Sequence, residues 1–186
     1  MFSFQLPKVL ASRYVRPFAL LAVAALAAPG AAMADSQWAS VGSTGVVDEA
    51  CQFSVMLNDY EARLMPGLLS ICTIRYQVVD TYNTPTPINL ALGARILDNV
   101  AGARVDVRLR SYNKLTGATA TVTSFNSDAP PVPPGPVDAA GFRPYRSAGC
   151  IALNFGTSSY WVEVDLVRFS LVIPPAVAMV NLFTPC

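Results

Sequence analysis

The sequence predicts an all-β fold, a two-sheet antiparallel sandwich of about eight strands. Apolar and polar residues alternate along several stretches, which is the period of a strand with one buried face. Turn-forming Asn, Asp, Gly and Pro residues separate these stretches, and 15 prolines are spread along the 186 residues. The best helical candidate, Asp59 to Leu69, is interrupted by Pro66 and Gly67. This strand pattern suits either a jelly roll or an immunoglobulin-like Greek key and does not choose between them.

The clearest strands show unbroken alternation. From Arg104 to Arg110, charged residues alternate with apolar ones, so the apolar residues would face the core together. Cys72 to Val78 and Tyr160 to Leu166 follow the same pattern. Weaker signals predict further strands over Gln52 to Leu57, Ile88 to Leu97, Thr119 to Phe125, Gly149 to Phe155 and Ala176 to Phe183.

Residues 1–34 have the order of a bacterial secretory signal peptide, in which basic, apolar and then small residues follow one another. Lys8, Arg13 and Arg16 precede the apolar centre Phe18 to Ala28, which is shorter than the roughly 20 residues of a membrane span. Ala32-Met33-Ala34 fits the A-x-A cleavage pattern. A membrane anchor or a buried helix is the alternative. We expect a single mature domain over 35–186, periplasmic or secreted, with no membrane span after cleavage.

All four cysteines lie in the expected mature domain, and an even count in an exported chain indicates disulfides. Their spacings fit no zinc pattern. Of the three possible connectivities we favour Cys51–Cys72 with Cys150–Cys186, because each bond would close a modest loop and the second would hold the C-terminus.

The composition excludes several kinds of chemistry. The chain has no histidine, so it has no Ser-His-Asp triad, no Cys-His dyad and no histidine-bound metal. With 13 basic and 12 acidic residues, it lacks the basic excess typical of nucleic-acid binding. We expect no catalytic residue, no metal and no cofactor.

Two constellations could still carry chemistry. Glu163 and Asp165 would share a strand face at a spacing within the range of glycosidase carboxylates, which makes a hydrolase the least favoured alternative. Pairing with the outward arginines of 104–110 is the simpler explanation. A calcium site is the second possibility, from four oxygen-bearing residues at strand ends, although turn chemistry explains them as well. These residues are Asp80, Asn83, Asp98 and Asn99.

A proline-rich connection over 129–146 breaks the strand pattern and should be extended. It could be a recognition loop, with its tip at Phe142, Arg143, Tyr145 and Arg146. The interpretation that we favour is a passive crossover between the two sheets, because a Greek key requires one long connection.

Trp161 falls on the otherwise polar face of its strand. It would either be exposed as a binding platform or pack under the proline-rich connection.

The chain also resembles small exported bacterial β-sandwich proteins over most of residues 50–186. The likeness rests on an early cysteine, the strand Ser70-Ile71-Cys72-Thr73-Ile74, and the late strand Tyr160 to Leu166 that ends near Arg168. The resemblance implies the fold and an export route, and it implies no activity.

These observations favour an exported, disulfide-stabilised β-sandwich that acts as a non-enzymatic binding or structural protein of the cell envelope. Its partner would be a protein or a glycan. The alternative is a carbohydrate-binding module, for which coplanar, exposed rings of Trp161, Tyr160 and Tyr145 would be the sign.

The signal peptide makes a direct prediction. Mass spectrometry of the protein purified from its native host should find a mature N-terminus at Asp35 or an adjacent residue, because signal peptidase cuts after small residues. Detection of the intact N-terminal segment in the exported protein would contradict it.

Overall fold

Two antiparallel sheets build the protein, as the sequence predicts. The computed structural model describes residues 36–81, 88–98, 101–171 and 173–184, and all of these fall in one compact unit. The expected signal peptide, 1–34, lies outside the described residues.

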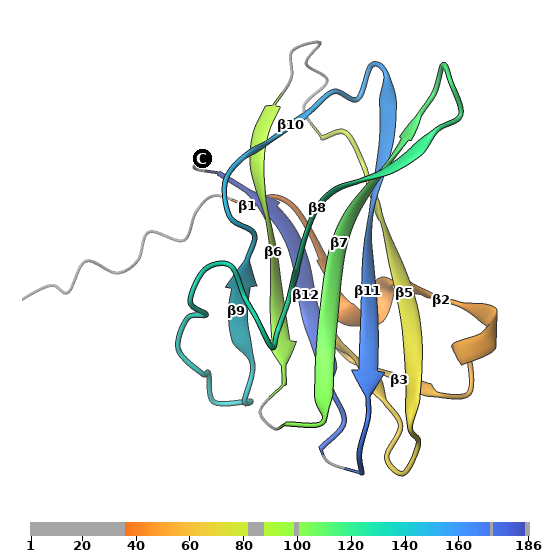
Figure 1. The fold of residues 1–186 in the computed structure, drawn as a ribbon, viewed down its shortest axis with the longest axis vertical. Helices are drawn as coiled ribbons and strands as arrows, with labels where there is room; N and C mark the ends of the chain where they lie inside the picture. The colour runs from red at the N-terminus through yellow and green to blue at the C-terminus, as the bar shows by residue number, and fades with distance from the viewer. Residues whose placement is uncertain (1–35, 82–87, 99–100, 172, 185–186) are drawn as a thin grey trace, which may run out of the picture. The chain divides into compact units, whose positions relative to one another are not determined.

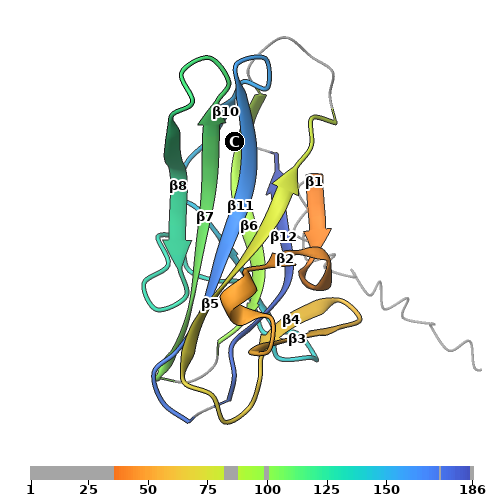
Figure 2. The same cartoon turned by 90° about the vertical axis from the view of Figure 1, so that its right-hand side faces the viewer.

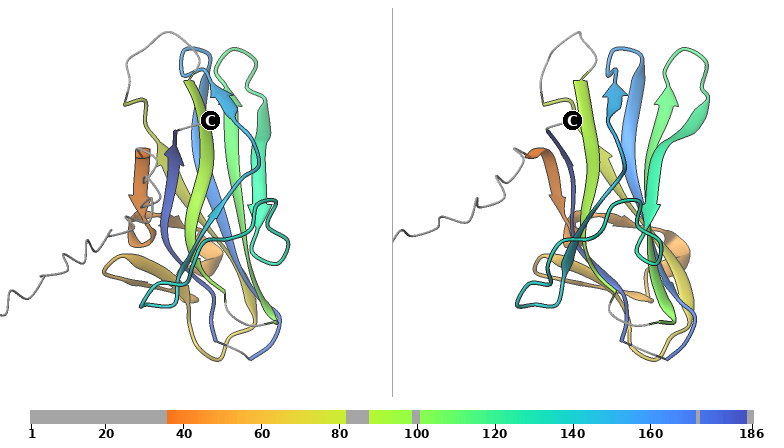
Figure 3. Two further views of the ribbon diagram at one scale, coloured as in Figure 1. Left: turned by 90° about the vertical axis from the view of Figure 1, so that its left-hand side faces the viewer. Right: turned by 60° about the vertical axis from the view of Figure 1, so that its left-hand side comes forward.

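The five-stranded sheet has the order β2 (Val46–Val47), β5 (Ser70–Val78), β11 (Ser158–Arg168), β7 (Ala103–Asn113) and β8 (Thr119–Asn126). The seven-stranded sheet runs β10 (Ile151–Leu153), β6 (Ile88–Leu97), β12 (Ala176–Phe183), β4 (Glu61–Leu64) and β3 (Val55–Asn58). In that sheet β1 (Ser36–Val41) also pairs with β12, and β9 (Arg143–Arg146) pairs with β6. Two short 3-10 helices, η1 (Gly42–Thr44) and η2 (Glu49–Cys51), complete the described elements. Figures 1 and 2 show β11 between β5 and β7, and Figure 3 shows the two layers.

The core lies between the two sheets and follows the predicted alternation. In β7, Val105, Val107 and Leu109 are fully buried, and the intervening residues face outward. In β11 the predicted inward residues, Tyr160, Val162, Val164 and Leu166, are likewise buried. Leu92, Ile96, Val180 and Leu182 belong to the same core cluster from the opposite sheet. Burial of these side chains supplies most of the driving force for folding.

Tyr76 shows how the core treats a polar group. Its ring is buried, and its hydroxyl donates a hydrogen bond to the Gly42 carbonyl over 2.8 Å. Burial raises the pKa of this phenol above its usual value, so it stays neutral. Gly42 itself is packed so tightly that a Cβ atom there would lie 2.0 Å from the Val177 carbonyl oxygen. A larger residue would therefore push η1 off the seven-stranded sheet.

The strand count was too low, and the structure corrects it. Strands β1, β2, β4 and β9 were not predicted, because they are short or lack a clean alternation. The helical candidate Asp59 to Leu69 contains β4 instead, and Asp59 turns the β3–β4 hairpin with a positive φ of 37°. The strand expected over Gln52 to Leu57 starts only at Val55, because η2 and a turn occupy the residues before it. The other predicted strands are confirmed.

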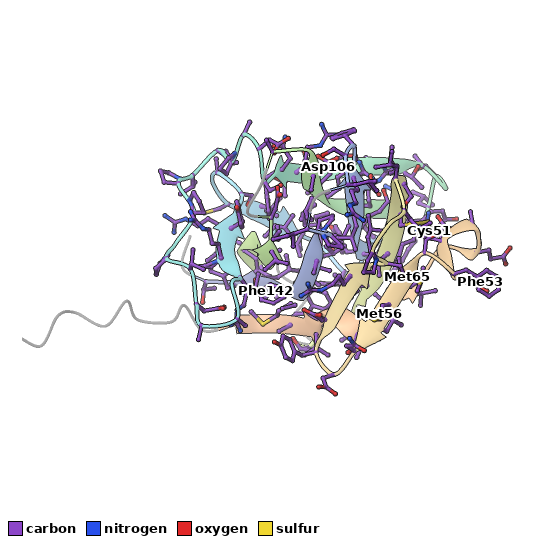
Figure 4. All side chains as sticks on the ribbon, turned by 90° about the horizontal axis from the view of Figure 1, so that it is seen from below. Cys51, Phe53, Met56, Met65, Asp106 and Phe142 are labelled. Carbon is purple, nitrogen blue, oxygen red and sulfur yellow. A yellow bond between two sulfur atoms is a disulfide. The ribbon has the colours of Figure 1, made fainter. Side chains whose placement is uncertain are left out.

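The disulfide Cys51–Cys72 is confirmed and ties η2 to β5. Both cysteines are buried, whereas Phe53, two residues after Cys51, is 89% exposed. Figure 4 shows Phe53 at the outer tip of this turn, pointing away from the rest of the protein. Cys150 is disulfide-bonded as well, and its predicted partner, Cys186, lies outside the described residues.

Removing this disulfide should destabilise the protein. The bond spans 21 residues, and closing a loop of that length is worth about 3 kcal/mol through the entropy of the unfolded chain. We expect the Cys51→Ala/Cys72→Ala variant to lose about that much free energy of unfolding in urea titration. A loss below about 1 kcal/mol would show that the fold does not depend on this bond.

Candidate ligand-binding groove

The proline-rich segment (residues 129–142) crosses from the five-stranded sheet to the seven-stranded sheet. It follows β8 and leads into β9, and Figure 3 shows this teal stretch running from one layer to the other. The Gly135 amide donates to the Pro144 carbonyl over 3.0 Å, which fastens the segment beside β9. A Cβ atom on Gly135 would lie 2.6 Å from the Pro144 ring, so glycine allows this close approach. The segment therefore bridges the two sheets, as the crossover interpretation expected.

Asp138 anchors the far end of the segment. Arg95 of β6 donates to its Oδ2 from Nε over 2.6 Å and also from Nη2. The Oδ1 atom accepts the amides of Ala140 and Phe142 over 2.8 and 3.1 Å. Desolvation opposes ionisation, but Arg95 and the two amides outweigh it and hold the pKa of Asp138 below its usual value.

Phe142 lies under this anchor. It is 1% exposed and packs with Leu97, Ala176 and Ala178 in a small apolar cluster separate from the main core. The Tyr60 ring meets it edge-on at 6.2 Å, and the Arg95 guanidinium lies 5.8 Å from its centroid. Phe142 is labelled in Figure 4. Two contacts thus hold the segment: the packing of Phe142 in its apolar cluster and the ion pair between Asp138 and Arg95.

A groove of about 670 Å³ lies between the segment and the outer face of β6, β9 and β12. Its lining is mostly apolar, with Arg95, Asp138, Arg146 and Asn181 as the side chains that carry charge or an amide. The lining residues are Ala94, Arg95, Pro133, Gly135, Pro136, Asp138, Pro144, Tyr145, Arg146, Met179, Asn181 and Phe183. The groove is therefore a concave apolar surface with few polar groups.

Strand register orders the floor of the groove into rows. Met179 pairs with Arg95, which pairs with Pro144. One step along, Asn181 pairs with Gly93, which pairs with Arg146. A Cβ atom at Gly93 would lie 2.4 Å from Asn181 Oδ1 and 2.9 Å from the Phe183 ring. Because Gly93 has no side chain, the side chains of Asn181 and Phe183 can pack directly against its backbone.

The predicted recognition tip is wrong in two of its residues. Phe142 is buried, and Tyr145 is 6% exposed and belongs to the main core. Burial, with the nearby negative charge of Asp98, raises the pKa of Tyr145. Tyr145 faces the core because 143–146 is strand β9 and not a loop, whereas Phe142 is buried in the small cluster with Leu97, Ala176 and Ala178. Arg143 is half-buried and Arg146 is exposed, and of the predicted tip only Tyr145 and Arg146 line the groove.

Trp161 lies on the outer face of the five-stranded sheet. The Arg110 guanidinium covers its ring at 5.9 Å from the centroid, and its indole Nε1 is buried without a hydrogen-bond acceptor. Tyr160 is buried, and its hydroxyl accepts the Asn154 amide over 2.9 Å. The coplanar platform expected of Trp161, Tyr160 and Tyr145 is therefore not formed.

Glu163 and Asp165 share the outer sheet face, as predicted, and both are paired. Glu163 contacts Arg75 at 3.3 Å and Arg108 at 3.0 Å, and Arg108 also bonds Asp165. The Thr73 hydroxyl donates to Asp165 over 2.7 Å. Burial lowers the pKa of Arg108, but these carboxylates outweigh it and raise it overall. The arrangement is the cross-strand pairing that the sequence favoured.

Of the four candidate calcium ligands, the structure describes Asp80 and Asp98. Asp98 accepts a hydrogen bond from the Ser127 hydroxyl, and burial raises the pKa of its carboxyl. Asn83 and Asn99 lie outside the described residues. Among the residues described, no three carboxylate or thiol side chains gather closely enough to hold a metal ion.

Sequence reasoning missed most of the groove, because its residues come from three strands and a loop. Arg95, Asp138 and the β12 residues Met179, Asn181 and Phe183 belong to three segments that lie far apart in sequence. One signal was available in β12, where Met179, Asn181 and Phe183 alternate with the buried Val180 and Leu182. That alternation places them on one outward face but does not reveal what covers it.

A scan against models of protein families found no match, and a search of curated proteins found no relative of this chain. The resemblance to small exported bacterial β-sandwich proteins therefore stays a prediction.

The anchor at Asp138 can be tested by separating its two functions. In Asp138→Asn the side-chain oxygen still accepts the Ala140 and Phe142 amides, whereas Asp138→Ala loses both these bonds and the Arg95 pair. Hydrogen exchange of those two amides should accelerate by at least about tenfold in the alanine variant and less in the asparagine variant. Equal exchange in both variants and the wild type would contradict the anchor.

The same carboxyl sets a pH dependence. Its pKa is lowered in the folded protein, so its contribution is complete above the unfolded value of about 3.9 and is lost as the pH falls through the lowered folded value. Exchange of the Ala140 and Phe142 amides should therefore stay protected at pH 4 to 5, after correction for the intrinsic rate. Loss of protection above about pH 5 would contradict this assignment.

Proposed function

We propose that the protein is an exported, non-enzymatic binding protein of the cell envelope that holds its ligand in the groove beside the proline-rich segment. The main support for this proposal is the groove itself. Its volume of about 670 Å³ falls within the range of small-molecule sites, and its lining is apolar with a few convergent polar groups. The wall is fastened by the Asp138–Arg95 pair and by Phe142, so the site is preformed.

Binding fits the charged residues better than catalysis does. The two carboxylates of the hydrolase alternative, Glu163 and Asp165, lie on the five-stranded sheet, where arginines of the same sheet pair with them. Catalytic acids and bases usually lie in a cleft with an unpaired proton-transfer group. The groove contains one carboxylate, Asp138, and Arg95 already occupies it.

Export is supported by two features. The Cys51–Cys72 disulfide suits an oxidising compartment such as the periplasm or the extracellular medium. The first 34 residues have the signal-peptide pattern described above. Among the described residues, no helix has the length and hydropathy that crossing a membrane requires.

The groove can be tested with a neutral, environment-sensitive apolar dye such as Nile red. The dye should bind the wild-type protein with one dominant site and gain fluorescence, because the groove shields it from water. Met179→Trp fills the floor and should weaken binding by at least about tenfold.

The matched control is Leu115→Trp, which introduces the same side chain at a hairpin tip where Leu115 is 93% exposed. It should leave dye binding within about twofold of wild type. Circular dichroism should show both variants folded. No saturable binding to the wild type, or equal binding by both variants, would overturn the proposed site.

A further inference from the structure

Two polar side chains of the groove lining, Arg146 and Asn181, form no ion pair or hydrogen bond with the residues that the structure describes. We infer that the ligand of the groove is an apolar chain with a single anionic head group, and that Arg146 with Asn181 binds that head group. This inference rests on the proposed function, because it names the ligand class of the same groove. To bind such a ligand, the groove needs a free cation, a neighbouring hydrogen-bond donor and an apolar surface that leads away from both.

Arg146 supplies the free cation. Its side chain is exposed at the groove and forms no ion pair or hydrogen bond with any residue that the structure describes. Arg143, on the same strand, is the only other arginine of the described ranges in this condition. The remaining ones each bond a carboxylate or main-chain carbonyls: Arg63, Arg75, Arg95, Arg104, Arg108, Arg110 and Arg168.

Arg95 cannot serve as a second anion site. Its guanidinium makes two hydrogen bonds to Asp138 and lies over the Phe142 ring. The charge at this end of the groove is therefore neutralised within the protein. Among the described residues of the lining, Arg146 carries the only uncompensated charge, so the groove favours one negative charge and no positive one.

Asn181 supplies the neighbouring donor. Register places Asn181 and Arg146 on opposite sides of Gly93, on the same face of the sheet. Within the described part of the protein its carboxamide makes no hydrogen bond, and its Oδ1 lies over Gly93, where a Cβ atom would come within 2.4 Å. An amide NH₂ and a guanidinium so placed can both donate to the oxygens of one carboxylate or phosphate.

The apolar track begins one row away. Two residues of strand advance about 6.8 Å, which is the distance from the Asn181 row to the Met179 row. There Met179 and Pro144 form the floor, and Pro133 and Pro136 form the wall. The Arg95–Asp138 pair borders this floor, because Arg95 lies in the same row as Met179 and Pro144. A chain that starts at Arg146 would thus bury its apolar part along this track.

The experiment compares amphiphiles that share one chain and differ in the head group. Dodecanoate, dodecyl phosphate and dodecanol, each kept below the concentration at which it aggregates, compete with Nile red for the wild-type protein. Both anionic compounds should displace the dye at concentrations at least about tenfold lower than dodecanol does. The stronger of the two anions identifies the head group as carboxylate or phosphate.

Arg146→Gln tests the residue, with Arg143→Gln as a control that removes the same charge from the same strand outside the lining. Arg146→Gln should weaken the anionic compounds by at least about tenfold and leave dodecanol within about twofold. Asn181→Ala should weaken the anions to a smaller extent. Arg143→Gln should change none of them by more than about twofold.

The two failures are distinguishable. If Met179→Trp does not reduce dye binding, the groove is not a site and the proposed function fails together with this inference. If the dye binds in the groove but dodecanol competes as well as the anions, only the ligand class is wrong. Equal losses in Arg146→Gln and Arg143→Gln would show a general effect of surface charge and would also overturn the role of Arg146.

Discussion

The packing of two alternating strand faces against each other is the constraint on which the rest of the structure depends. β11 is paired along its whole length with β7 and from Tyr160 to Arg168 with β5, so its inward residues must match two neighbours and the opposite sheet at once. A shift of register by one residue would bring Glu163 and Asp165 into the core and expose Val162 and Val164. The burial of the apolar residues therefore fixes the register. The same register places the arginines and carboxylates of β7 and β11 on the outer face of the sheet.

The seven-stranded sheet uses its outer face differently. The outer face of the five-stranded sheet carries paired charges, whereas Leu97, Ala176 and Ala178 on the seven-stranded sheet are apolar and buried. Phe142 of the proline-rich segment packs against these residues and shields them from solvent. The groove is the part of this outer face that the segment crosses without filling. Its position thus follows from the need to bury a second, smaller apolar cluster outside the main core.

The sequence predicted those parts of the fold that depend on local alternation. The long strands β5, β7 and β11 were recognised because each repeats the pattern several times. Strand β9 was missed because Arg143-Pro144-Tyr145-Arg146 contains a proline and has too few residues to show a period. That omission caused the error at Tyr145, which was expected at an exposed loop tip and is a largely buried strand residue at the edge of the groove. The disulfide Cys51–Cys72 was favoured among three possible connectivities because it closes a modest loop.

The groove could not be predicted, since it depends on which sheet face the segment covers. The alternation in β12 shows that Met179 and Asn181 share a face, and only the tertiary fold brings Arg146 and the prolines to them. The carboxylate of Asp138 illustrates the same limit. Its hydrogen bonds to nearby amides are local, but its partner Arg95 lies 43 residues earlier in the chain.

The manner in which the proline-rich segment is attached has an evolutionary consequence. It is held by one ion pair, one buried aromatic ring and a few backbone hydrogen bonds, and it contributes no strand between β8 and β9. Its composition and length can therefore drift while the hydrogen-bonded ladders of both sheets stay unchanged. Substitutions at Pro133 or Pro136 would reshape one wall of the groove at little cost to folding. Selection for a new ligand could thus act on this wall almost independently of selection for a stable fold.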